Sequence, residues 1–132
     1  MSDNYKYNIL IIDDSITNVV LLNALLSEEG FITQTAFNVP DALKLINKNL
    51  PDLVLLDLNL PVVSGFDFLK TVKTDKKISN IPIIVVTAYN DYKNIQQSKA
   101  LGADDFIEKP VNIDILIKKI NNTLKNHENV SN

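Results

Sequence analysis

The sequence contains three short apolar runs that each end in a polar residue, and these runs limit the fold more than any other feature. They span residues 8–13 (NILIID), 52–57 (DLVLLD) and 81–87 (IPIIVVT). Because their apolar residues are consecutive, both faces of each strand should be covered, as in a parallel sheet. Segments 31–36 (FITQTA) and 104–107 (DDFI) are more polar or shorter, and they fit strands at the sheet edges.

Helical patterns fill the gaps between these runs. Helices are predicted after Ser15, Asn38, Asp91 and Asn112, which can each cap a helix N-terminus, and over residues 65–74. Alternating strands and helices of this length predict a doubly wound α/β sandwich with right-handed crossovers. We expect a single domain over residues 1–132, with a folded core of about 7–126 and polar tails at both ends, the C-terminal one frayed.

Composition excludes several classes of protein. The chain has no cysteine, so a disulfide scaffold and a thiolate metal site are ruled out. Its net charge is −3 and all 13 basic residues are lysines, which argues against direct nucleic-acid binding. No apolar run approaches the roughly 18 residues of a membrane span, and the N-terminus lacks a signal-peptide layout. These features predict a cytoplasmic protein with no membrane partner.

The polar residues that end the strands carry the functional prediction. Ligands of open α/β sheets bind beyond the C-terminal ends of the strands, where this chain places Asp13, Asp14, Asp57, Thr87 and Lys109. Neighbouring carboxylates repel one another unless a cation compensates them. Oxygen ligands without histidine or cysteine suit Mg²⁺, with Mn²⁺ as the alternative. The hydroxyl and the ammonium could then hold a phosphoryl group, and Asp57, alone at its strand end, is the candidate nucleophile.

Four segments together resemble a two-component response-regulator receiver domain over essentially the whole chain. They are residues 9–14 (ILIIDD), 53–61 (LVLLDLNLP) with Gly65, 83–88 (IIVVTA) and 102–110 (GADDFIEKP). The resemblance implies a flavodoxin-like three-layer sandwich, with a five-stranded parallel sheet of order 2-1-3-4-5 and five helices. It also implies an aspartyl-phosphate, formed with Mg²⁺ bound.

The resemblance assigns roles to the acidic residues one by one. Asp57 matches the phosphoryl acceptor, which also contacts the metal. Asp14 matches a direct metal ligand, and Asp13 matches the acid that acts mainly through a metal-bound water. Asn59 matches the position whose backbone carbonyl binds the metal.

The resemblance also assigns the switch residues. Thr87 matches the hydroxyl that moves toward the phosphoryl group, and Ala88 the small residue whose N–H helps to hold it. Lys109 matches the lysine that pairs with the acceptor, and its bond to Pro110 is expected to be cis. Phe106 matches the aromatic switch position, although packing in the core is an equally good interpretation of that residue.

Two positions of the family flank the path of the water that removes the phosphoryl group. They correspond here to Asn59 and Tyr89. We expect the bulky Tyr89 to slow the entry of water and so to prolong the life of the aspartyl-phosphate.

The first predicted helix carries more apolar residues than one buried face needs. We expect Leu21, Leu22, Ala24 and Leu25 to face the sheet, which leaves Ile16, Val19, Val20 and Asn23 on an outer face. In the family this helix docks the phosphodonor, so the outer face is the predicted partner surface; a wide core stripe is the alternative. Asn18 resembles receivers of hybrid kinases, but stand-alone receivers carry it too.

The predicted function is therefore a phosphorylation-controlled switch and not a separate enzyme. A histidine kinase or phosphotransfer protein, or a small phosphodonor, would supply the phosphoryl group. Output should pass through an unknown protein partner, because no DNA-binding module follows residue 126. The sequence leaves open whether phosphorylation drives homodimer formation, and whether the chain is a module of a hybrid sensor kinase.

Three other functions fit the sequence less well. A pseudo-receiver that only binds partners would be expected to lack one of the site residues, and none is missing. Many aspartyl-phosphate phosphohydrolases need a second acid two residues after the nucleophile, where this chain has Asn59. A flavodoxin would need a hydroxyl- and glycine-rich phosphate loop after the first strand, where Asp13 and Asp14 would repel phosphate.

Overall fold

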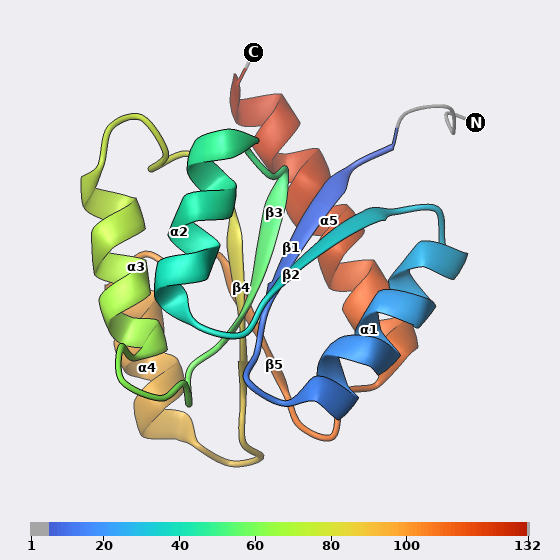
Figure 1. Ribbon diagram of the computed structural model, residues 1–132, viewed down its shortest axis with the longest axis horizontal. Coiled ribbons are helices and arrows are strands. Elements are labelled where there is room, and N and C mark those ends of the chain that lie inside the picture. The colour runs from blue at the N-terminus through green and yellow to red at the C-terminus, as the bar shows by residue number, and fades with distance from the viewer. Residues whose placement is uncertain (1–5, 132) are drawn as a thin grey trace.

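The computed structural model describes residues 6–131 of the chain, with side chains through residue 128. Figure 1 shows a central twisted sheet with helices on both faces. Helices α1 and α5 cover one face, and α2, α3 and α4 lie on the other side. The predicted N-terminal tail falls almost entirely on residues 1–5, which lie outside the described residues.

The sheet has five parallel strands in the order β2-β1-β3-β4-β5. Their bounds are β1 Asn8–Ile12, β2 Ile32–Ala36, β3 Leu53–Asp57, β4 Ile83–Thr87 and β5 Asp105–Glu108. The polar segments predicted at the edges, β2 and β5, do lie there. Both the predicted α/β sandwich and its strand order are confirmed.

The helices begin at the residues that the sequence predicts. They are α1 Ile16–Glu28, α2 Val39–Lys48, α3 Gly65–Thr74, α4 Tyr92–Ala100 and α5 Ile113–Ser131. The side chains of Ser15, Asn38, Ser64 and Asp91 accept hydrogen bonds from first-turn N–H groups. Asn112 does the same for the N–H of Ile115 at 3.1 Å. These caps satisfy N–H groups that have no partner within the helix.

Consecutive strand residues pack into two separate cores. In β1, Ile9 and Ile11 join the core against α1 and α5, while Leu10 and Ile12 join the core against α2 and α3. All five residues of β3 and all five of β4 are buried. The uninterrupted apolar runs are thus explained by burial of both sheet faces.

The burial of residues along α1 contradicts one part of the predicted partner surface. Val19 is 4% exposed and lies in the core with Leu22 and Leu26. These residues are separated by three and four positions, which places them on one face of a helix. Ile16, Val20 and Asn23 are exposed as predicted, and Leu21 and Ala24, expected against the sheet, are exposed as well.

Helix α5 continues to Ser131, beyond the expected end of the folded core near residue 126. Leu124 is the last buried residue among those whose side chains are described. No glycine or proline interrupts residues 113–131. The hydroxyl of Tyr7, just before β1, also donates a hydrogen bond to the carboxylate of Glu128, which ties the last turns of α5 to the rest of the domain.

Substitutions of the neighbouring residues Val19 and Val20 test which face of α1 is buried. We expect Val19→Ala to lower the free energy of unfolding by about 1–3 kcal/mol, because it leaves a cavity in the core. Val20 is 61% exposed, so Val20→Ala should change stability by less than about 0.5 kcal/mol. Urea unfolding of both variants would measure the difference, and equal losses of stability would contradict the assignment.

Candidate functional site

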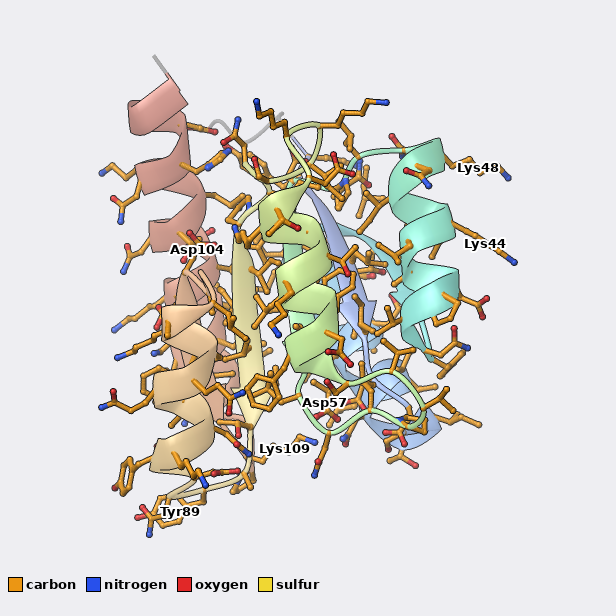
Figure 2. The ribbon with its side chains drawn as sticks, turned by 90° about the vertical axis from the view of Figure 1, so that its left-hand side faces the viewer. Lys44, Lys48, Asp57, Tyr89, Asp104 and Lys109 are labelled. Atoms are coloured by element: carbon orange, nitrogen blue, oxygen red, sulfur yellow. The ribbon has the colours of Figure 1, made fainter. Side chains whose placement is uncertain are left out.

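The parallel register brings the predicted site residues to one edge of the sheet. Ile12 of β1 pairs with Leu56 of β3, so Asp13 and Asp57 follow at the same level. Asp57 pairs with Val86 of β4, which places Thr87 one residue further along the neighbouring strand. In Figure 2, Asp57 and Lys109 lie at the same end of the molecule, with Tyr89 at the rim beyond them.

Asp57 is an acidic side chain held in a nearly closed environment. Its side chain is 5% exposed, and its Oδ2 lies 3.2 Å from the ammonium nitrogen of Lys109. Its Oδ1 accepts a hydrogen bond from the backbone N–H of Asn59 at 2.9 Å. Burial, aided by the nearby charge of Asp13, raises the pKa of Asp57, although the Asn59 N–H and Lys109 counteract this effect. Asp57 is therefore an anion that its surroundings only partly compensate.

Asp13 is buried as well, and protein donors contact both of its oxygens. Its Oδ1 accepts the backbone N–H of Ser15 at 2.9 Å, and its Oδ2 accepts the side-chain amide of Asn18 at 3.4 Å. The sequence did not predict that Asn18 would contact the site. Its place in the first turn of α1, directly after the acid pair, is the signal that could have suggested it.

The three acids form a group whose geometry suits a hard divalent cation. One carboxylate oxygen from each of Asp13, Asp14 and Asp57 lies within 4.8 Å of the others. Asp14 is exposed, so the group opens to solvent on one side. Since all the donors are oxygens, Mg²⁺ and Mn²⁺ fit this set better than zinc does.

Thr87 and Lys109 are held by the pairing of β4 and β5. Thr87 is 4% exposed, and its backbone carbonyl accepts the N–H of Lys109 at 2.8 Å. The peptide bond between Lys109 and Pro110 is cis. Ala88 and Tyr89 follow Thr87 and are both exposed, Tyr89 by 69%. The structure therefore brings Asp57, Thr87 and Lys109 together and leaves Tyr89 at the mouth of the site.

Gly65 permits the loop after Asp57 to fold back tightly. A β-carbon at this position would lie 2.7 Å from the Cα of Leu58 and 2.8 Å from the carbonyl oxygen of Asp57. Both atoms belong to the backbone, which cannot easily move aside. Close approach to the backbone, and not a positive φ, therefore explains the glycine at this position.

Phe106 lies beside the site and is only partly buried. It packs against the core that α2 and α3 cover. It also lines a surface hollow of about 400 Å³ together with Tyr89, Lys109 and Pro110. Core packing is thus observed, and a switch role stays a prediction.

Comparison with known proteins identifies the family. The model of the response regulator receiver domain matches residues 9–121. The chain belongs to this family. The strand order, the acidic edge and the lysine beside Asp57 are therefore features of a receiver domain that acts as a phosphoacceptor in two-component signalling.

Similar receivers include proteins of about the same length. The chain is 42% identical over 106 residues to Sporulation initiation phosphotransferase F of Bacillus subtilis, covering 80% of this chain and 84% of that protein. It is 36% identical to Protein PilH of Pseudomonas aeruginosa, covering 88% and 96%. The crystal structure of a response regulator from Chloroflexus aurantiacus superposes with a TM-score of 0.89 at 30% identity, covering 92% and 99%.

The raised pKa of Asp57 predicts how stability depends on pH. A carboxyl whose pKa is raised on folding destabilises the native state when ionised, and this cost is relieved as pH falls through the folded pKa toward the ordinary value. Without a divalent cation, Asp57→Asn should therefore unfold at a higher urea concentration than the wild type at pH 7.5. The difference between the urea concentrations that unfold the two proteins should become smaller as the pH is lowered toward 4.5.

Mg²⁺ should make the wild type more stable than Asp57→Asn. A ligand present at about 100 times its Kd stabilises the native state by about 2.7 kcal/mol, and this gain should be much smaller in Asp57→Asn. Asp67→Asn, an exposed acid of α3, is the control and should gain no stability at pH 7.5. A wild type no less stable than Asp57→Asn in EDTA would contradict the prediction.

Proposed function

We propose that Asp57 is the phosphoacceptor of this receiver and that Asp13 and Asp14 help to hold the Mg²⁺ that the reaction needs. The observation that carries the proposal is the contact of 3.2 Å between Asp57 and Lys109, inside the group of three acids. A buried carboxylate with one ammonium neighbour and two anionic neighbours is a nucleophile in a site arranged for charge neutralisation. A backbone carbonyl ligand from Asn59 is part of the same proposal.

The reaction is a transfer of one phosphoryl group. A carboxylate oxygen of Asp57 attacks the phosphorus of a phosphohistidine or a small acyl phosphate. The new oxygen–phosphorus bond forms as the bond to the donor breaks, and the electron pair of that bond leaves with the imidazole or the carboxylate. Bound Mg²⁺ would supply positive charge for the carboxylates and phosphoryl oxygens. Lys109, Thr87 and the N–H of Ala88 then hold the product's oxygens.

The same site loses its phosphoryl group by hydrolysis, and no other enzymatic reaction is proposed. Asn59 stands two residues after Asp57, where many aspartyl-phosphate phosphohydrolases need a second acid. Asn59 is exposed and gives Asp57 its backbone N–H. A receiver that holds its phosphoryl group is thus favoured over a phosphohydrolase.

Phosphorylation would act through the loop after β4 and through Phe106. The phosphoryl group carries roughly −1.5 to −2 charge, in place of the single negative charge of the Asp57 carboxylate. Thr87 and Lys109 move toward this charge, and Phe106 fills the space that Thr87 leaves. The face made by α4, β5 and α5 changes as a result, by a shift between two packed arrangements.

The outer face of α1 is the proposed docking surface for the phosphodonor. Ile16 is 68% exposed and Val20 61%, and both lie on the helix that directly follows the acid pair. Asn23 shares this exposed side, and Leu21, 56% exposed, extends it. Val19, which the sequence placed on this surface, is buried and is not part of it. Exposed apolar side chains on the helix that follows the acid pair suit a partner that must bring a phosphohistidine to Asp57.

The remaining proposals concern the cellular context. We propose a histidine kinase or a histidine phosphotransfer protein as phosphodonor, an output protein as downstream partner, and a cytoplasmic location. None of the helices in the described part of the chain is both long and apolar enough to cross a bilayer. We also propose that the whole chain forms a single receiver domain without direct nucleic-acid binding.

Intact-mass measurement tests the phosphoacceptor directly. With Mg²⁺ and acetyl phosphate, the wild type should gain the mass of one phosphoryl group, because Asp57 is the only proposed acceptor. Asp57→Asn should stay unmodified, and EDTA should suppress labelling of the wild type. Asp67→Asn, whose residue lies on the exposed side of α3, should label like the wild type. Equal labelling of Asp57→Asn would show that the acceptor is elsewhere.

Replacement of Tyr89 tests control of the phosphate lifetime. Tyr89→Ala should shorten the half-life of the aspartyl-phosphate severalfold, because a small side chain at the rim lets water reach the phosphorus more often. The loss of label after removal of acetyl phosphate measures this rate. Tyr92→Ala, which changes a tyrosine of similar exposure (65%) on α4, serves as control. An unchanged half-life in Tyr89→Ala would refute the idea.

A further inference from the structure

Two lysines from different helices approach the ring of Phe106. The ammonium nitrogen of Lys99, in α4, lies 5.2 Å from the ring centroid, and that of Lys119, in α5, lies 4.7 Å from it. Both distances fall within the range of cation–π attraction, which is about 6 Å. The ring of Phe106 is thus attracted by cations from both helices that flank β5.

Lys119 is held in place by further contacts. Its ammonium forms an ion pair with Asp105 at 3.1 Å and donates to the backbone carbonyl of Phe106 at 2.7 Å. Its side chain is 27% exposed, so water screens these interactions less than it would on an open surface. Lys119 is therefore a fixed charge beside the ring. Lys99 is exposed on α4 and places a second positive charge near the ring.

The ring of Phe106 borders an open hollow that reaches Lys109. Phe106 lines the hollow of about 400 Å³ that also contacts Lys119, Tyr89 and Lys109. Phe106 pairs with Val85 of β4, two residues before Thr87. A change in the position of the ring would thus alter the packing next to Lys109 and near the end of β4.

We propose that Lys99 and Lys119 are positioning residues that hold Phe106 in its unphosphorylated arrangement and so set how readily Asp57 is phosphorylated. This inference rests on the proposed function, in which Phe106 moves toward the space that Thr87 leaves. Movement of the ring toward Thr87 would carry it away from the two lysines and weaken this attraction. The attraction therefore opposes the switched arrangement, and its removal should favour phosphorylation.

The first experiment tests the contact itself, without phosphorylation. In an NMR spectrum of protein with ¹³C-labelled lysine, protons next to the ammoniums of Lys99 and Lys119 should resonate upfield, because they lie over an aromatic ring. Phe106→Leu should abolish both upfield shifts and leave Lys93, on the same helix as Lys99, unchanged. Ordinary shifts for Lys99 and Lys119 in the wild type would overturn the proposal.

The second experiment tests the effect on the reaction. Lys99→Met removes the charge and keeps a long side chain, and it should raise the initial rate of labelling by acetyl phosphate about 2- to 5-fold. Lys93→Met is the matched control on α4 and should label at the wild-type rate. Lys119→Met should act in the same direction, while Lys119→Arg, which keeps a cation over the ring, should restore the wild-type rate.

A third comparison separates positioning from a general effect on the fold. In a Phe106→Leu background, Lys99→Met should no longer change the labelling rate, since there is no ring to hold. The same rate increase in both backgrounds, or no increase in either, would overturn the proposal. A wild type that is not labelled at all would instead refute the proposed function, so the two failures are distinguishable.

Discussion

Burial of two carboxylates side by side at one edge of the sheet is the constraint on which the site depends. The register of β1 and β3 sets Asp13 and Asp57 level with each other, and both are buried. Water cannot screen them well, so the protein supplies donors of its own. The N–H groups of Ser15 and Asn59 and the ammonium of Lys109 do this, yet the pKa of Asp57 stays raised. The site is therefore prepared for additional positive charge.

The apolar sheet makes this unfavourable arrangement possible. Every residue of β3 and β4 is buried, and the two cores on opposite faces leave these strands little freedom to move. The acid at the end of β3 thus cannot relax away from Asp13 by a shift of its strand. Gly65 adds to this constraint, since its lack of a side chain allows the loop to pack against the backbone of Asp57. Stability in the cores thus offsets local repulsion at the edge.

The sequence was most informative where the type of residue alone decides the local structure. Unbroken apolar runs identified the central strands, and cap residues marked the helix starts. The faces of α1 were harder to predict, because apolar residues occupy most positions from Val19 to Leu26 and periodicity cannot separate two apolar faces. The pairing of Lys99 and Lys119 with Phe106 was not predictable either. It joins three elements whose approach depends on the packing of the whole domain.

The loop after β4 and strand β5 are joined by hydrogen bonds at Thr87 and at Asn90. The backbone N–H of Lys109 donates to the carbonyl of Thr87, and the side chain of Glu108 accepts the N–H of Asn90, both at 2.8 Å. These two bonds bracket the segment that contains Ala88 and Tyr89. A displacement of the backbone between Thr87 and Asn90 would therefore strain β5 or break one of these bonds. Phe106 lies on the same short strand, so β5 offers a physical connection between the end of β4, beside Asp57, and the ring.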